Sequence, residues 1–231
     1  MLNENKIECG IGAEVQRSED NSLLNGKGQF GDDLGYPRGT LHVAVLRSPH
    51  AAAKIINIDT KDAISIIGVH SVIDGNSFSR ISKPLLSVLR INIEVWPCAI
   101  DRVRYVGEPV ALILAKNRYI AEDAIDQIKV KYEKLIPVID PEKAIEKKAI
   151  KVHEEIESNT VSDRHFSYGN PKEAFKEADK VIELKIQYPR NSCTPLEGFV
   201  IQSDFNKNDN GYTVKSNFQG PFSLHPVIAR S

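Results

Sequence analysis

The stretch from Asp101 to Asp140 constrains the fold more than any other part of this chain, because strand-like and helix-like patterns follow one another there with short connections. Residues 110–115 form an almost unbroken apolar run, as expected of a buried strand. Residues 118–127 place their apolar side chains on one helical face, and Asn117 can cap that helix. Two further segments have strand patterns and flank these elements: residues 102–106 and 128–132. This succession predicts a compact α+β domain.

The segments before this block extend the same domain. Gly and Asp are frequent in the first forty residues and favour turns, because Gly allows positive φ and Asp can bond its own backbone. Three apolar runs predict strands: residues 41–46, 54–59 and 69–73. Thr60 can cap a short helix that Gly68 would end, and residues 75–97 are expected to form an irregular connection. We therefore assign residues 1–142, with their N-terminal extension, to one domain.

The remainder of the chain has weaker patterns. Residues 143–165 are charged and lack a strong apolar period, so we expect a linker. A short helix is expected at residues 171–179. Three segments then have strand patterns: residues 180–188, 199–205 and 212–218. Asn208–Gly211 is a hairpin-turn signal between the last two. Because no further elements follow to pair with these strands, residues 166–231 are expected to be an incomplete mixed α/β segment.

Charge and cysteine content exclude several functions. The chain has 30 Lys and Arg against 31 Asp and Glu, so it lacks the basic surplus that nucleic-acid binding usually needs. It has no apolar run long enough to span a bilayer and no signal-peptide pattern at its start, so we expect a cytoplasmic protein with no membrane partner. Cys9, Cys98 and Cys193 are far apart, which argues against disulfides and against a zinc or iron–sulfur site in this chain.

Few residues stand out as candidates for chemistry. The glycines at 26, 28 and 31 neither follow a strand nor open a helix, so a turn is favoured over phosphate binding. Six histidines are widely spaced and suggest no metal site. Glu108 lies in a Gly-Glu-Pro turn, where bonding to turn amides is the favoured interpretation. Glu197 lies in an apolar stretch and is the better candidate, with a role that is either structural or catalytic.

Several segments resemble the start of a molybdenum hydroxylase large subunit, the family of xanthine dehydrogenase, aldehyde oxidase and aerobic carbon monoxide dehydrogenase. They occur in the order and at the spacing of the family: residues 11–20, 26–33, 41–51, 101–110 and 121–124. The resemblance implies an α/β-hammerhead domain over residues 1–142. It continues through residues 168–231, which are similar to the beginning of the molybdopterin-binding region.

Two motifs in the second part carry residue-level implications. Residues 217–222 resemble the segment whose glutamine hydrogen-bonds an oxygen ligand on molybdenum, and Gln219 takes that position at the end of an expected strand. A neutral amide there can donate a hydrogen bond without changing its protonation state. The alternative is that Gln219 bonds only to neighbouring backbone. Residues 194–197 resemble a family segment whose glutamate is not the catalytic base, so the resemblance weakens a catalytic assignment for Glu197.

The resemblance also implies that other chains carry part of the cofactor site and the remaining redox groups. The glycine-rich cofactor loop and the catalytic glutamate of the family fall outside these residues, so we expect no catalytic residue and no metal ligand here. A partner chain would supply the rest of the molybdopterin domain, with molybdenum expected as molybdopterin cytosine dinucleotide. FAD and 2Fe–2S clusters would reside on a medium and a small subunit. The substrate would be a small aldehyde, a heterocycle or carbon monoxide, with water as the oxygen source.

Two other interpretations remain open at this stage. The chain could be a non-catalytic scaffold that binds the other hydroxylase subunits without contributing to the metal site. It could also be an incomplete gene product without independent biology. The residues at 196–198 favour the carbon monoxide and aldehyde branches over the purine branch only slightly. The substrate is therefore not identified by the sequence.

Overall fold

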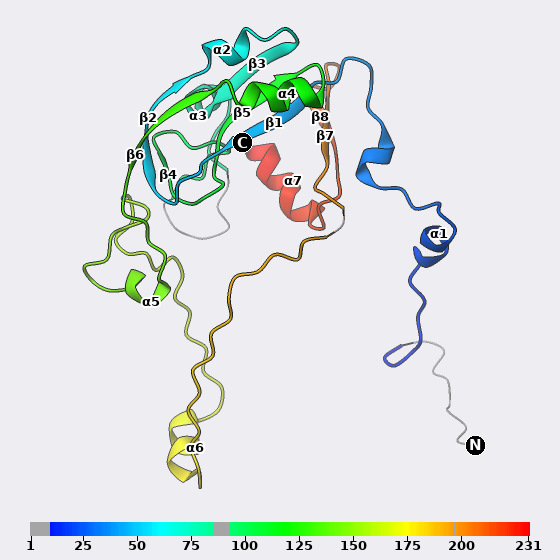
Figure 1. The fold of residues 1–231 in the computed structure, drawn as a ribbon. Helices are drawn as coiled ribbons and strands as arrows, with labels where there is room; N and C mark the ends of the chain where they lie inside the picture. The colour runs from blue at the N-terminus through cyan, green and yellow to red at the C-terminus, as the bar shows by residue number, and fades with distance from the viewer. Residues whose placement is uncertain (1–9, 86–92, 196) are drawn as a thin grey trace. The chain divides into compact units, whose positions relative to one another are not determined.

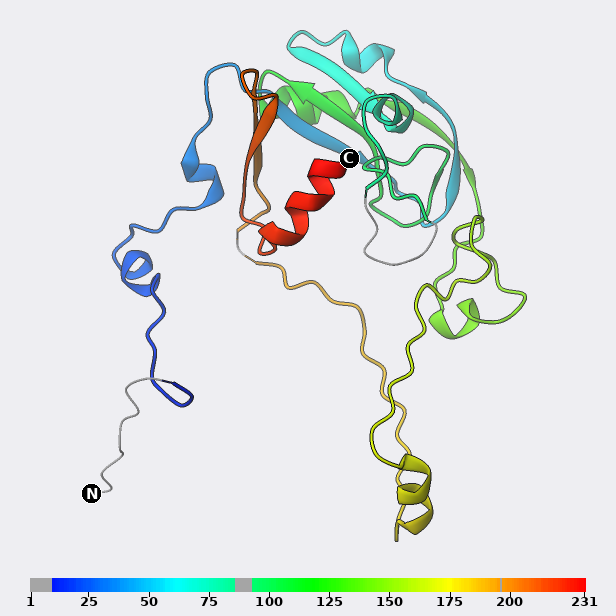
Figure 2. The same ribbon diagram turned by 180° about the vertical axis from the view of Figure 1, so that it is seen from behind.

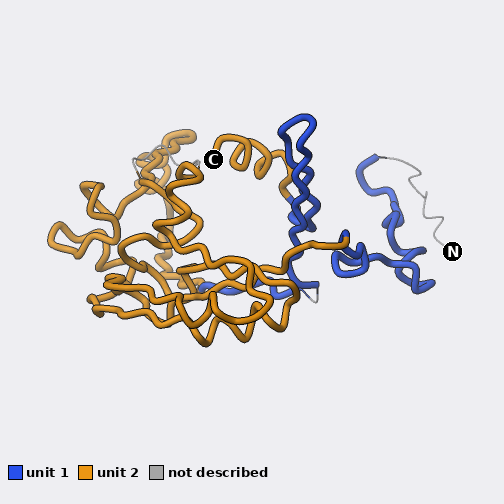
Figure 3. The backbone as a smooth tube through the Cα atoms, turned by 90° about the horizontal axis from the view of Figure 1, so that it is seen from above, with its two compact units in different colours: residues 1–37, 190–219 blue, residues 38–189, 220–231 orange. Residues whose placement is uncertain are grey.

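The computed structural model describes residues 10–85, 93–195 and 197–231 (Figure 1 and Figure 2). The chain divides into two compact units, each assembled from separate segments (Figure 3). One unit contains residues 1–37 and 190–219, and the other contains residues 38–189 and 220–231. The two units group residues that lie close together in space. The domain boundaries expected at residues 142 and 166 stay predictions.

The larger unit is built on an antiparallel sheet in the order β1-β5-β3 (Figure 1). Its central strand β5, Pro109–Ala115, pairs with β1, His42–Arg47, and with β3, Val69–Asp74. Ile113 in β5 is fully buried, as the apolar run predicts. Helix α4, Arg118–Ile125, packs on this sheet through small apolar side chains. The sheet and α4 therefore confirm the α+β core expected from residues 101–140.

A second antiparallel sheet of this unit has the order β4-β2-β6. Strand β2, Ala53–Asp59, pairs along most of its length with β6, Lys129–Lys134. Strand β4 covers only Arg102–Val103, so the expected strand at residues 102–106 is mostly wrong. The reason is local, because the Glu108 carboxylate accepts a hydrogen bond from the Arg104 amide and folds residues 104–108 into a loop.

Two short helices, α2 and α3, follow strands in the described part of the larger unit. Helix α2, Lys61–Ile64, follows Thr60 as expected, although the Thr60 side chain makes no capping hydrogen bond. Helix α3, Gly75–Ser79, begins where an irregular connection was expected. Asp74 caps it by accepting a hydrogen bond from the Ser77 amide at 2.8 Å. Glycine is needed at position 75, because a Cβ there would lie within 2.7 Å of the Ala99 carbonyl carbon.

The charged segment after β6 is folded around local side-chain contacts. Helix α5, Pro141–Ala144, is capped by Asp140. Asn159 donates hydrogen bonds to the carbonyls of Ala144 and Ile150 and accepts one from the Val152 amide. Helix α6, Pro171–Glu177, then forms close to the expected place and starts with proline in its first turn. These contacts order a stretch whose sequence pattern predicted only a linker.

The strand expected at residues 180–188 is absent from the structure (Figure 2). The segment has no regular secondary structure, and its side chains are exposed. A strand needs a neighbour to satisfy its backbone N–H and C=O groups, and the described residues provide none for residues 180–187. The strand predicted for residues 180–188 is therefore wrong for the described structure, because these residues have no strand to pair with.

The described part of the smaller unit contains two short helical segments and a hairpin. Helix α1 spans Asp20–Leu24, and the 3-10 helix η1 spans Gly31–Leu34 in the stretch where turns were expected. Strands β7, Ile201–Asn206, and β8, Gly211–Ser216, form the expected antiparallel hairpin. Its turn places Asn210 at a φ of 53°.

The last helix, α7, covers Pro221–Arg230 and belongs to the larger unit. Its formation was not expected, since Pro226 lies within it. Among the helices of the described residues, none is long and apolar enough to cross a membrane.

Candidate functional site

Gln219 lies just beyond the hairpin of the smaller unit. Strand β8 ends at Ser216, so Gln219 occupies a bend between β8 and α7 and does not end a strand as expected. Its side chain is exposed, and within the described parts of the chain its amide makes no hydrogen bond. The alternative in which Gln219 bonds only to neighbouring backbone therefore has no support in this structure. The cofactor role of Gln219 stays a prediction.

Asn217 holds the strand end that precedes Gln219. Its Oδ1 accepts a hydrogen bond from the Val200 amide at 3.1 Å, and its Nδ2 donates to the Gly198 carbonyl at 2.9 Å. Ser216 Oγ accepts a further hydrogen bond from the Phe218 amide at 3.1 Å. These hydrogen bonds restrict the conformation of the backbone at residues 216–218, immediately before Gln219. Sequence reasoning missed Asn217, although it lies in the same motif as Gln219.

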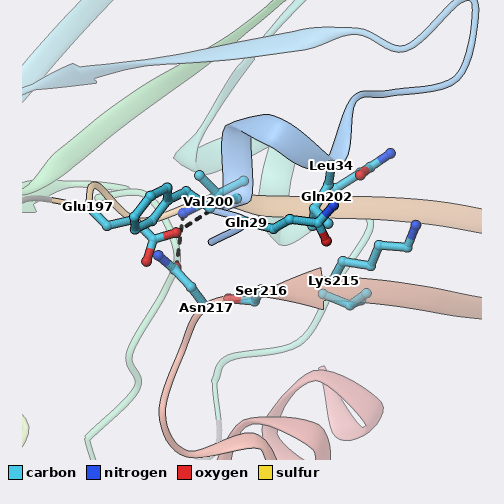
Figure 4. Close-up of a pocket in the computed structure, with 11 residues that line it drawn as sticks. Gln29, Leu34, Glu197, Val200, Gln202, Lys215, Ser216 and Asn217 are labelled. Carbon is cyan, nitrogen blue, oxygen red and sulfur yellow. Dashed lines mark hydrogen bonds between the residues drawn. The ribbon is translucent and has the colours of Figure 1, made fainter. Parts of the chain in front are cut away.

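A cavity of about 420 Å³ opens beside this strand end within the smaller unit (Figure 4). Its polar lining comes from three parts of the unit: Gln29, Glu197, Gln202, Lys215, Ser216 and Asn217. Amides, one hydroxyl and one ammonium can donate hydrogen bonds to an acceptor-rich ligand. Gln219 is not part of this lining. The cavity has the chemistry of a binding surface and lacks an arranged nucleophile and base.

Glu197 has a structural contact in the wall of this cavity. Its Oε1 accepts a hydrogen bond from the Gly31 amide at 2.8 Å, and the side chain is half-buried (Figure 4). A Cβ at position 31 would lie 2.6 Å from Val200 Cβ, so glycine permits this close approach. The contact joins residues 31 and 197, which are far apart in the sequence. A carboxylate that bonds backbone in this way fits the structural interpretation of Glu197.

The other candidate residues do not form a site. Glu108 bonds the Arg104 amide, in agreement with the loop role predicted for it. His50 packs edge-on against Tyr132 with ring centroids 4.9 Å apart, and His153 lies 3.0 Å from Glu155. Across the residues that the structure describes, no group of three or more His, Cys, Asp or Glu side chains could hold a metal ion.

The cysteines have contrasting environments. Cys98 is fully buried in the larger unit, and this burial, together with the nearby Asp74 carboxylate, raises the pKa of its thiol to about 11. Cys193 is exposed. Cys9 lies outside the described residues. Neither described cysteine has a disulfide partner among the described residues.

Comparison with known families matches both parts of the chain. The family described as "Aldehyde oxidase and xanthine dehydrogenase, a/b hammerhead domain" matches residues 25–136. The family described as "Molybdopterin cofactor-binding domain" matches residues 152–231. The two matches follow each other along the chain and together include β1 to β8.

Individual relatives agree with these matches. The chain is 36% identical over 214 residues to the 6-hydroxypseudooxynicotine dehydrogenase complex subunit gamma of Paenarthrobacter nicotinovorans, covering 87% of this chain and 26% of that protein. It is 29% identical to the carbon monoxide dehydrogenase large chain of Afipia carboxidovorans, covering 95% of this chain and 29% of the relative. The crystal structure of quinoline 2-oxidoreductase from Pseudomonas putida 86 superimposes with a TM-score of 0.82 at 30% identity, over 93% of this chain and 28% of that one.

The chain thus spans between a quarter and a third of the length of these relatives. The agreement extends over nearly all of its own length, through both the hammerhead and the cofactor-domain segments. The chain belongs to the molybdenum hydroxylases and corresponds to the N-terminal portion of their large subunit, with a hammerhead domain and the start of a molybdopterin-binding domain.

Proposed function

We infer that this chain is the N-terminal part of a large subunit that oxidises a small aldehyde, a heterocycle or carbon monoxide, with water as the oxygen source. The names of its relatives support this range, since they include a quinoline oxidoreductase and a carbon monoxide dehydrogenase. The observation that carries the proposal is the cofactor-domain match over residues 152–231, which contains the exposed amide of Gln219. We propose that residues 1–142 form the hammerhead domain with its N-terminal extension. Residues 143–165 would then be a linker, and residues 166–231 the segment of the molybdopterin-binding domain.

The residues near Gln219 fit a molybdopterin cofactor in one respect. The Gln219 amide is exposed and makes no hydrogen bond in the described chain, so its N–H groups are available to an acceptor oxygen of the cofactor. Asn217 restrains the backbone that leads to it. When bound, molybdenum as molybdopterin cytosine dinucleotide would supply the two-electron redox chemistry. Gln219 would orient that centre by a neutral hydrogen bond and would exchange no proton.

Further chains complete the proposed enzyme. In this proposal a second polypeptide carries the rest of the molybdopterin-binding domain. FAD on a medium subunit and 2Fe–2S clusters on a small subunit would carry electrons away. A 2Fe–2S cluster requires four ligands, commonly cysteines, and this chain has three cysteines in total. Two relatives are themselves named as subunits, one of a dehydrogenase complex and one of a probable xanthine dehydrogenase, which agrees with such assemblies.

A substitution at Gln219 tests the proposed role in the assembled complex. Gln219→Ala removes the amide donor, and we expect a loss of about 10- to 100-fold in turnover or in molybdenum retention. Gln127→Ala is the matched control, because Gln127 is also exposed and follows α4 in the hammerhead segment. Molybdenum content and turnover are measured on the same preparations.

Equal turnover and equal molybdenum content in the two variants would contradict the cofactor role of Gln219. That result would favour the alternative in which the chain is a scaffold that binds the other subunits without contacting the metal site.

A further inference from the structure

A second cavity, of about 470 Å³, lies within the larger unit. Most of its lining comes from three segments: residues 102–104, which include β4, residues 135–138, which follow β6, and residues 150–154, which follow α5. It shares no residue with the cavity beside Asn217, which belongs to the smaller unit. A volume of this size is within the usual range for sites that bind small molecules.

The polar part of this lining is mostly cationic. Arg102, Arg104 and Lys151 bring three positive charges, and Glu154 is the one carboxylate among the described lining residues. That carboxylate is already paired, because Glu154 Oε1 lies 2.8 Å from Arg102 Nη2. Arg104 and Lys151 therefore leave a surplus of positive charge at the cavity, which attracts an anion.

Arg104 has hydrogen-bonding capacity that the described chain uses only weakly. Its Nη1 lies 3.5 Å from the Arg102 carbonyl oxygen, and within the described residues its buried Nε has no hydrogen-bond partner. A buried N–H without an acceptor is unfavourable, so the guanidinium gains by reorienting toward a stronger acceptor. The planar donor pair of a guanidinium matches the two oxygens of a carboxylate.

The apolar part of the lining favours a ligand with an apolar body. Ile136 and Ile150 are 72% and 49% exposed, and Val138 and Val152 are half-buried. An apolar group in the cavity would remove part of this surface from water. A small hydrated anion such as inorganic phosphate would leave the same surface wet. The lining therefore combines charge recognition with an apolar contact.

We propose that this cavity binds a small carboxylate with an aromatic or branched apolar body. The Arg104 guanidinium donates to the carboxylate, and Lys151 adds to the positive charge around it. Ile136 and Ile150 pack against the apolar body of the ligand. The inference uses only residues of the larger unit and does not rest on the proposed function.

The test titrates the full chain at pH 7 and low ionic strength with three probes, followed by NMR. Benzoate has both the carboxylate and an apolar ring, benzamide keeps the ring without the charge, and inorganic phosphate keeps the charge without the ring. We expect benzoate to bind with a Kd of about 1 mM, at least about tenfold more tightly than either of the other probes. Absence of saturable benzoate binding would overturn the proposal, as would equal affinity for benzoate and benzamide or for benzoate and phosphate.

Two pairs of substitutions locate the site. Lys151→Ala and Ile136→Ser each remove a lining side chain, and we expect each to weaken benzoate binding about threefold. Lys148→Ala and Ile139→Ser are their matched controls outside the lining and should leave the affinity unchanged. All four side chains are exposed, so circular dichroism of the variants should match the unmodified chain. Unchanged affinity in Lys151→Ala or in Ile136→Ser would place benzoate elsewhere and overturn the proposal.

A conservative substitution tests the role of the guanidinium itself. Arg104→Lys keeps the positive charge and loses the planar pair of donors, so we expect benzoate binding to weaken at least about fivefold. An Arg104→Lys chain with the circular dichroism and the benzoate affinity of the unmodified chain would overturn the assignment of Arg104 as the group that receives the carboxylate.

Discussion

Contacts between residues that are far apart in the sequence hold segments of the smaller unit together. Gly31 is the clearest case, since its amide donates to Glu197 while its missing Cβ leaves room for Val200. Sequence reasoning identified Glu197 as a carboxylate in need of a partner, and it could not name Gly31. A hydrogen bond between residues so far apart depends on the folded chain and leaves no local pattern.

Substitution at Gly31 should destabilise this unit. Gly31→Ala places a Cβ 2.6 Å from Val200 Cβ, and we expect overpacking to cost about 1–3 kcal/mol in the free energy of unfolding. Gly198→Ala is the matched control, because a Cβ there meets no atom within 4 Å. Denaturant unfolding of both variants measures the difference. A Gly31→Ala chain as stable as Gly198→Ala would contradict the packing described here.

The two described cysteines should differ strongly in reactivity. At pH 8 a thiol with a pKa of about 11 is only about one-thousandth thiolate, and Cys98 is also buried. Iodoacetamide should therefore label Cys193 in the native chain and Cys98 only after unfolding. Peptide mapping by mass spectrometry separates these sites from Cys9. Labelling of Cys98 at the rate of Cys193 before unfolding would show that Cys98 is not buried.

At the scale of elements, the sequence predicted those strands that are paired by their neighbours in this chain. The apolar runs at 41–46, 69–73 and 110–115 became β1, β3 and β5, whose core positions are occupied by aliphatic side chains. The segment at 180–188 also has a strand pattern and formed no strand, because no pairing partner is present among the described residues. The pattern of apolar residues indicates that a segment can form a strand, whereas strand formation also requires a neighbouring segment that pairs with its backbone.

Helices were predictable where a cap and an apolar face coincided. Helix α4 has both, through Asn117 and the buried Ala121 and Ala124. Helix α3 has a capping aspartate and almost no apolar period, and sequence reasoning therefore missed it. Its position depends on the close approach of Gly75 to Ala99, which is a tertiary contact.

The ion pair between α2 and β6 gives a pH-dependent prediction. Lys129 Nζ lies 2.7 Å from Asp62 Oδ2, and this hydrogen bond and charge lower the pKa of Asp62 below its ordinary value of 3.8. The pair's contribution to stability is therefore present above pH 3.8 and is lost as pH falls through the lowered pKa. It should be small, because both side chains are exposed.

An NMR titration of the Asp62 carboxyl group checks this shift directly. Lys129→Ala should bring the pKa of Asp62 back toward 3.8, while Lys131→Ala, two residues further along β6, should leave it lowered. An unchanged Asp62 pKa in Lys129→Ala would show that the ion pair is not formed in solution.

At the scale of the whole molecule, the described residues line a polar cavity and do not by themselves assign a chemistry to it. The described chain has no metal-binding cluster, and the cavity beside Asn217 is lined on its polar side by amides, a serine, a lysine and a structural glutamate. The resemblance in sequence motifs predicted the family, and both domain matches confirm it. Gln219 could be singled out only through that resemblance, because an exposed glutamine after a strand has no distinctive local pattern.

Our central proposal is that this chain contributes residues to a molybdopterin site. The most direct measurement is the molybdenum and pterin content of the complex isolated from its native cells through a tag on this chain, by elemental analysis and pterin fluorescence. We expect close to one molybdenum and one pterin per copy of the chain, released together when the complex is dissociated. A stable native complex that contains neither molybdenum nor pterin would contradict it.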